Sequence, residues 1–117
     1  MRLKHIKNAD IIIESSPYLV KNPSDYKGKW NELFNNDNPI DIEIGMGRGK
    51  FIISLALENP NINYIGIEKY DSPLVSAVKK LAGININNLK LICMDASNIN
   101  DIFDKEINKI YLNFSDP

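Results

Sequence analysis

The chain has 117 residues, of which 44% are hydrophobic, enough for the core of one small domain. Lysine and arginine together number 14 against 15 acidic residues, so the formal charge of −1 does not indicate a nucleic-acid-binding protein. A single cysteine excludes an intramolecular disulfide, and no apolar run reaches the roughly 18 residues of a membrane span. We therefore expect a cytoplasmic protein without a membrane partner.

Residues 1–23 are interpreted as a basic N-terminal arm, because their periodicity is weak and they end at Asn22-Pro23. Basic residues outnumber acidic ones over residues 1–30. This excess is a weak indication of a polyanionic partner, and a solvated basic surface explains it more simply.

A helix is predicted after the arm, where Ser24 is a typical N-cap residue. Aromatic and leucine side chains recur there at helical spacing through residue 34, and we expect this stripe to pack into the core. Gly28 is the weak point of the predicted helix. A turn is predicted over residues 35–39.

Strands and helices alternate along the rest of the chain. Strands are predicted over residues 40–44, 63–67, 89–93 and 109–114, and helices over residues 50–58 and 72–82, with a short turn or helix over 99–103. Ser72 is the expected cap of the helix that Gly83 ends. Cys93 is expected to be a small buried strand residue and not a nucleophile. The alternation predicts an α/β fold with a parallel sheet of about four strands and flanking helices.

The most informative motif joins the first predicted strand to the helix after it. It reads Glu43-Ile-Gly45-Met-Gly47-Arg-Gly49. Glycine permits positive φ and close approach of a ligand to the backbone, and the helix N-terminus attracts anions. A dinucleotide fingerprint starting at Gly45 would need a glycine at position 50, where Lys50 stands. The spacing therefore argues against a nicotinamide-dependent dehydrogenase. A glycine-rich turn without a ligand is the simpler alternative to a ligand-binding loop.

Acidic residues stand at or just beyond the ends of all four predicted strands. They are Glu43, Glu68, Asp95 and Asp116. Ligands of parallel α/β sheets bind beyond the carboxyl ends of the strands. Glu68 lies 23 residues after Gly45, close to where a Rossmann unit places the acid that binds ribose hydroxyls. The glycine motif with its acid, Glu43, also resembles the first motif of Rossmann-like S-adenosylmethionine-dependent methyltransferases. For that ligand, Asp95 would be placed to accept a bond from the adenine amine, and Glu43 to attract the methionyl ammonium group.

Four blocks of the sequence together resemble the bacterial tRNA (guanine-N7-)-methyltransferase family. They cover residues 22–30, 37–51, 63–68 and 110–117, in the same order as in the family. The resemblance implies a Rossmann-like S-adenosylmethionine-dependent methyltransferase domain over residues 24–117, with tRNA as its substrate and no metal. It also implies that the cofactor is held by Glu43, Gly45, Gly47, Gly49, Glu68, Asp95 and Asp116. Asp116, in Asn-Phe-Ser-Asp-Pro, corresponds to the family's active-site acid.

The resemblance also has limits, because the family's arm is usually richer in arginine than residues 1–23 are. RNA contact by this arm is therefore left open. The family continues past the final proline with a basic segment and the rest of its sheet. We expect this chain to be the cofactor-binding half of a longer enzyme, incomplete relative to the family and at best a weak cofactor binder alone.

Guanine N7 carries a lone pair and no proton, so its methylation needs no general base. Asp116 would either stabilise the positive charge on the methylated purine or accept bonds from the guanine N–H groups. Two other functions are compatible with the residues. The Asp-Pro pair also resembles the motif of amino-group methyltransferases that act on DNA or protein, and the basic arm also suits a non-catalytic RNA-binding module.

Overall fold

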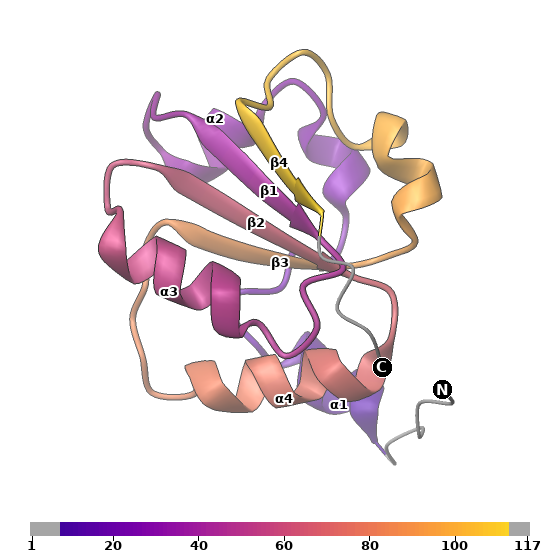
Figure 1. The fold of residues 1–117 in the computed structure, drawn as a ribbon. Coiled ribbons are helices and arrows are strands. Elements are labelled where there is room, and N and C mark those ends of the chain that lie inside the picture. The colour runs from indigo at the N-terminus through magenta and orange to yellow at the C-terminus, as the bar shows by residue number, and fades with distance from the viewer. Residues whose placement is uncertain (1–7, 113–117) are drawn as a thin grey trace.

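The computed structural model describes residues 8–112, and its centre is a parallel four-stranded sheet in the order β3-β2-β1-β4 (Figure 1). The strands are β1 (Ile40–Ile44), β2 (Asn63–Glu68), β3 (Leu89–Cys93) and β4 (Lys109–Leu112). All four predicted strands and their parallel arrangement are confirmed. The last two residues predicted for β4 lie outside the described residues.

Helices cover both faces of the sheet (Figure 1). They are α1 (Ala9–Glu14), η1 (Pro23–Tyr26), α2 (Trp30–Phe34), α3 (Lys50–Glu58), α4 (Asp71–Leu81) and η2 (Ala96–Asp101), where η marks a 3₁₀ helix. One core contains Leu74 of α4 and Leu91 of β3, and the other contains Trp30 of α2 and Ile65 of β2. No helix in the described part of the chain is long and apolar enough to cross a membrane.

The predicted continuous helix from Ser24 is wrong, because Gly28 separates η1 from α2 with a φ of +76°. Glu106, far along the chain, stabilises this break. Its carboxylate accepts hydrogen bonds from the backbone N–H groups of Gly28 (2.6 Å) and Trp30 (3.2 Å). The predicted packing of the aromatic stripe is confirmed, since Trp30 is completely buried and its Nε1 donates to the Ile102 carbonyl (2.7 Å).

The helix boundaries differ from prediction at two further places. Asp71 begins α4 and Tyr70 precedes it as N-cap, so Ser72 lies inside the helix and is not the cap. Gly83 follows the end of α4 with a φ of +78°, as its predicted role requires. The short element predicted over 99–103 is η2, which begins earlier because Asp95 accepts a bond from the Ser97 N–H (3.0 Å).

Part of the predicted arm packs against the sheet domain. In α1, which the weak periodicity of the arm did not predict, Ala9 and Ile13 are buried in the same core as α4. Further along, Leu19 forms a parallel bridge with Leu91 at the outer side of β3. These contacts make residues 9–20 contribute to the core. A domain boundary at residue 23 stays a prediction.

A close contact between Met46 and Gly66 supports the connection after β1. Met46 is 2% exposed, and a Cβ added to Gly66 of β2 would lie 2.5 Å from the Met46 sulfur. Real Cβ atoms do not approach other atoms so closely, so a glycine at position 66 is what allows Met46 to lie against β2. The connection from β1 to α3 therefore rests directly on the sheet.

We expect Gly66→Ala to lower the free energy of unfolding by about 1–3 kcal/mol, because the new methyl group must displace Met46 from a packed core. Urea denaturation of both proteins measures the change. In a double-mutant cycle, adding Met46→Ala should make the cost of Gly66→Ala smaller. Equal costs of Gly66→Ala with and without Met46 would show that this contact is not the cause.

Candidate functional site

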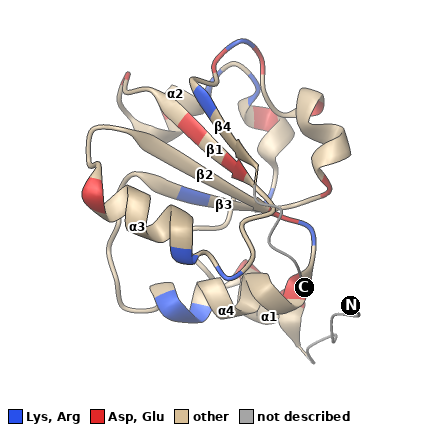
Figure 2. Cartoon of the chain, viewed as in Figure 1, with Lys and Arg blue, Asp and Glu red and all other residues tan. Residues whose placement is uncertain are grey.

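Two of the predicted site residues, Glu43 and Glu68, lie at the carboxyl ends of β1 and β2. In strand register Glu43 stands beside Gly66, and Glu68 stands beside Cys93. Neighbours in parallel register project to the same face of the sheet, so both glutamates lie on the face that α3 and α4 cover. They are only 1% and 6% exposed, and Figure 2 shows acidic positions within the central strand β1. Carboxylates are rarely buried in this way without a specific role.

The three glycines after β1 have the positive φ angles that the sequence predicts. The values are +75° at Gly45, +59° at Gly47 and +82° at Gly49. An added Cβ at Gly47 would meet no atom within 4 Å, whereas at Gly49 it would lie 3.2 Å from the Ala77 Cβ. Gly47 therefore faces open space, while Gly49 lets the start of α3 approach α4.

Hydrogen bonds fix residues 45–49, hereafter the glycine loop, to β2 and α4. The N–H groups of Gly45 and Met46 both donate to the Ile67 carbonyl, over 2.9 and 3.1 Å. Lys80 of α4 donates from Nζ to the Arg48 carbonyl (3.1 Å), a contact that the sequence did not indicate. The loop is thus held from two sides.

Glu68 is held by the glycine loop itself. Its Oε1 accepts from the Gly47 N–H (2.8 Å) and its Oε2 from the Tyr70 N–H (3.0 Å). The sequence placed Glu68 and the loop at the same sheet edge but did not predict this direct contact. Each carboxylate oxygen has two lone pairs, so Glu68 can accept further bonds from ligand hydroxyls.

Asp95 lies beside this cluster because the ends of β2 and β3 are joined by a hydrogen bond from the Met94 N–H to the Glu68 carbonyl (3.1 Å). Its Oδ1 caps η2, and its Oδ2 lies 3.6 Å from Nζ of Lys69. The Ser97 N–H lowers the pKa of Asp95 below its ordinary value, and the charge of Lys69 acts in the same direction. Lys69 was not singled out from the sequence, although it directly follows Glu68.

The structure thus brings Glu43, the glycine loop and Glu68 together, with Asp95 at their side. Asp116 lies outside the described residues. Within residues 8–112, no three histidine, cysteine, aspartate or glutamate side chains gather as they would around a metal ion.

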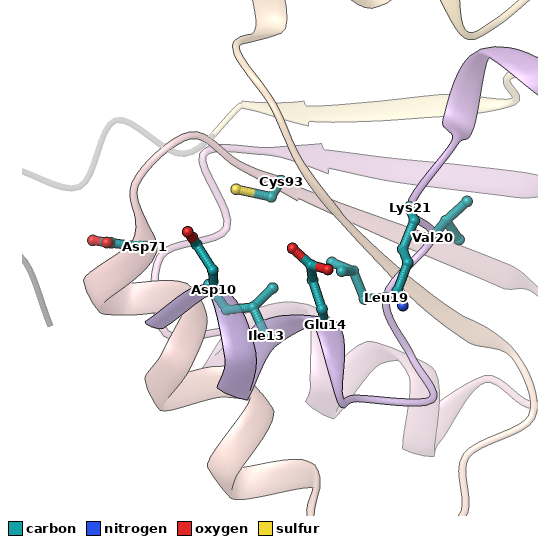
Figure 3. Close-up of a pocket in the computed structure, with 8 residues that line it drawn as sticks. All are labelled: Asp10, Ile13, Glu14, Leu19, Val20, Lys21, Asp71 and Cys93. Carbon is teal, nitrogen blue, oxygen red and sulfur yellow. The ribbon is translucent and has the colours of Figure 1, made fainter. Parts of the chain in front are cut away.

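A cavity of about 270 Å³ opens next to the end of β3, between α1 and the start of α4 (Figure 3). Its lining includes Asp10, Glu14, Asp71 and Cys93. Cys93 is exposed, so its predicted burial is wrong. Partial burial of the thiol nevertheless raises its pKa, and the charges of Asp71, Glu68 and Asp10 act in the same direction. A thiol that stays protonated is a poor nucleophile.

Residues 37–117 match the model of a protein family described as "Putative methyltransferase". The chain belongs to this family. Over its whole length it is 53% identical to the tRNA (guanine-N(7)-)-methyltransferase of Lachnoclostridium phytofermentans and 49% identical to that of Bacillus subtilis. It covers 55% and 56% of these two proteins, so it spans about half the length of the curated relatives it matches.

A solved structure of a methyltransferase-type protein from Streptococcus mutans, in complex with SAH, has the same fold. It is 20% identical, with a TM-score of 0.55, and the match covers 97% of this chain and 53% of the other. The Rossmann-like methyltransferase fold predicted from the sequence is confirmed, in a form shorter than that of the family members.

We expect Glu68→Gln to lower the free energy of unfolding by about 1–3 kcal/mol, because the amide has one carbonyl oxygen and its NH₂ leaves either the Gly47 or the Tyr70 N–H facing a second donor. Chemical denaturation measures this loss. Glu58→Gln, at the exposed end of α3, removes the same charge as a control. Equal stability of the two variants would contradict the role assigned to the Glu68 hydrogen bonds.

The lowered pKa of Asp95 sets the direction of a pH effect. The Asp95 charge stabilises the folded chain above the unfolded-state pKa of about 3.9, and this contribution is lost as the pH falls through the lower folded-state pKa. Carbon-13 NMR of the Asp95 carboxyl group should therefore give a midpoint below that of the urea-unfolded chain. Asp95→Asn should remove the contribution of this carboxyl group to acid unfolding. A midpoint in the folded chain at or above the midpoint in the unfolded chain would refute the lowered pKa.

Proposed function

We propose that this chain forms the S-adenosylmethionine-binding half of a cytoplasmic enzyme that methylates guanine N7 in tRNA. The observation that carries the proposal is the hydrogen bond from the Gly47 N–H to the Glu68 carboxylate. It joins the glycine motif to the acid that is predicted to bind ribose hydroxyls. The identity with two tRNA (guanine-N(7)-)-methyltransferases over the full length of the chain supports the choice of tRNA.

The described residues fit the parts of this cofactor. Glu68 retains acceptor capacity for ribose hydroxyls, and Oδ2 of Asp95 is available to an adenine amine if Lys69 shares it. The open space at Gly47 admits a ligand against the backbone. Beyond the loop, the first N–H groups of α3 favour a carboxylate, and Glu43 supplies negative charge for an ammonium group.

When bound, S-adenosylmethionine supplies a methyl group on a positively charged sulfur. Guanine N7 attacks with its own lone pair, so no side chain of this protein has to remove a proton. The residues of the chain act by orientation and electrostatics, which are the terms that such a reaction needs. Asp116 is proposed as the active-site acid, which either stabilises the positive charge on the methylated guanine or accepts bonds from guanine N–H groups.

The relatives contain a part that this chain does not span. An equivalent segment is proposed to supply the rest of the active site. In agreement with this assignment, β4 is the last strand on its side of the described sheet. Ile110 and Leu112 of β4 are 52% and 56% exposed. An apolar strand at a sheet edge is a surface that other polypeptide segments normally cover.

We expect the 117-residue chain to bind S-adenosylhomocysteine, and Asp95→Ala to weaken this binding about tenfold through loss of the acceptor for the adenine amine. Isothermal titration calorimetry measures both affinities. Asp101→Ala, at an exposed position of η2, is the matched control and should bind like the wild type. Absence of binding both by the wild-type chain and by the completed chimera described next would refute the cofactor assignment.

Methyl transfer is tested in a chimera that joins residues 1–117 to the part of the Bacillus subtilis relative beyond the matched region. This chimera should form 7-methylguanine in tRNA, detected by mass spectrometry after nuclease digestion. Asp95→Ala should reduce its activity. A chimera that binds the cofactor but methylates DNA or protein instead of tRNA would support the amino-group alternative.

A further inference from the structure

Basic residues gather where the glycine loop meets α3 and α4. Figure 2 shows blue positions in the loop, at the start of α3 and at the end of α4. Lys80 donates from Nζ to the Arg48 carbonyl (3.1 Å), and a Cβ added to Gly49 would lie 3.2 Å from the Ala77 Cβ of α4. These contacts bring the segments together. The exposed residues Arg48, Lys50, Lys79 and Lys80 are hereafter the basic patch.

Two members of the basic patch stand where a helix disfavours positive charge. Lys50 is the first residue of α3, and Arg48 directly precedes its N-cap, Gly49. The N-terminus of a helix carries partial positive charge, so it attracts anions and repels cations. The first turn of α3 contains no acidic residue that would compensate. The stability of α3 therefore does not explain why Arg48 and Lys50 are basic.

The basic patch has no acidic partner in the part of the chain that the structure describes. Within residues 8–112, none of its four side chains forms an ion pair with a carboxylate. Like charges that lie close together repel one another, and an anion bound among them relieves this repulsion. The phosphates of successive nucleotides are anions that meet several cations at once.

The basic patch also lies beside the place where the proposed methyl acceptor must arrive. Arg48 directly follows Gly47, whose open side admits the cofactor. In the first turn of α3, Phe51 packs edge-to-face on Tyr111 of β4, with ring centres 5.2 Å apart. The start of α3 is therefore adjacent to β4, the strand that precedes Asp116 in the sequence.

We propose that the basic patch binds the phosphate backbone of the tRNA next to the target guanine, with Arg48 and Lys50 as its main contacts. The planar guanidinium of Arg48 suits a bidentate phosphate contact, and Lys50 supplies a compact charge. Contacts of this kind fix the position of a nucleic acid without reading its sequence. This inference rests on the proposed function, in which tRNA is the substrate.

Phosphate contacts have a characteristic dependence on salt. The logarithm of the association constant falls with the logarithm of the salt concentration, with a slope of about −0.7 to −0.9 for each phosphate neutralised. Loss of one contact should therefore make the slope shallower by about that amount. Near physiological salt it should weaken binding about fivefold. A side chain with a purely structural role would not change this slope.

The test measures binding of an unmodified tRNA transcript by fluorescence anisotropy at several salt concentrations, with the 117-residue chain and with the chimera. Arg48→Met and Lys50→Met each remove one charge, and we expect each to show the shallower slope and the weaker binding. Lys105→Met removes a charge from the exposed turn before β4, at the amino ends of the strands, and should bind like the wild type. Lys80 is left unchanged because its hydrogen bond supports the glycine loop.

Two further measurements accompany the anisotropy. Circular dichroism checks that each variant is folded. Isothermal titration calorimetry should give an affinity for S-adenosylhomocysteine within about twofold of the wild type, because the proposed contacts are to RNA. If Arg48→Met and Lys50→Met weaken this ligand as strongly as tRNA, the two side chains serve the carboxylate of the cofactor and the RNA contact is refuted.

The remaining outcomes separate this inference from the proposed function. If the chimera methylates tRNA, but Arg48→Met and Lys50→Met keep the wild-type slope and affinity, the role of the basic patch is refuted and the proposed function stands. An equal loss in Lys105→Met would show a general charge effect and also overturn that role. If neither the chain nor the chimera binds tRNA, the proposed substrate and the role of the basic patch fall together.

Discussion

The backbone N–H groups of the glycine loop hold the carboxyl ends of β1 and β2 together, and the candidate site depends on this connection. Gly45 and Met46 donate to the Ile67 carbonyl, and Gly47 donates to the Glu68 carboxylate. The loop is therefore attached to β2 through both main chain and side chain. A site built on packed strands in this way holds its groups more accurately than one built on a free loop.

The same hydrogen bonds also explain how Glu68 is tolerated at a buried position. A buried carboxylate is costly unless donors compensate it, and two backbone N–H groups do so here. The further bond between Met94 and the Glu68 carbonyl extends the arrangement to β3. Because the spatial order is β3-β2-β1, Asp95, Glu68 and Glu43 follow one another along a single edge of the sheet. The groups along that edge differ in their chemistry, so together they can bind several parts of one extended ligand.

Orientation is the main task of an enzyme whose nucleophile needs no proton removed, and a rigid sheet edge suits that task. The relatives of this chain are about twice its length, and the exposed β4 shows where the sheet of the described residues stops. In the proposed enzyme, the ends of β1, β2 and β3 bind the cofactor, and the segments beyond β4 complete the substrate-binding part of the active site.

The sequence by itself determined the strands, their parallel arrangement, the glycine loop and the acids at the ends of β1, β2 and β3. These features depend on local periodicity and on the φ angles that only glycine adopts easily, so neighbouring residues suffice to predict them. The spacing from Gly45 to Glu68 even indicated the pairing of loop and acid at one edge, although not their hydrogen bond.

Only the tertiary structure decided the features that depend on residues distant in the chain. Glu106 stabilises the break at Gly28 from 78 residues away, and α1 is too short to show a clear period and is held by its packing on α4. The exposure of Cys93 and the approach of Lys69 to Asp95 follow from where α1, β2 and β3 end in space. A local pattern cannot predict such contacts, because their free energy arises from groups that meet only after the chain has folded.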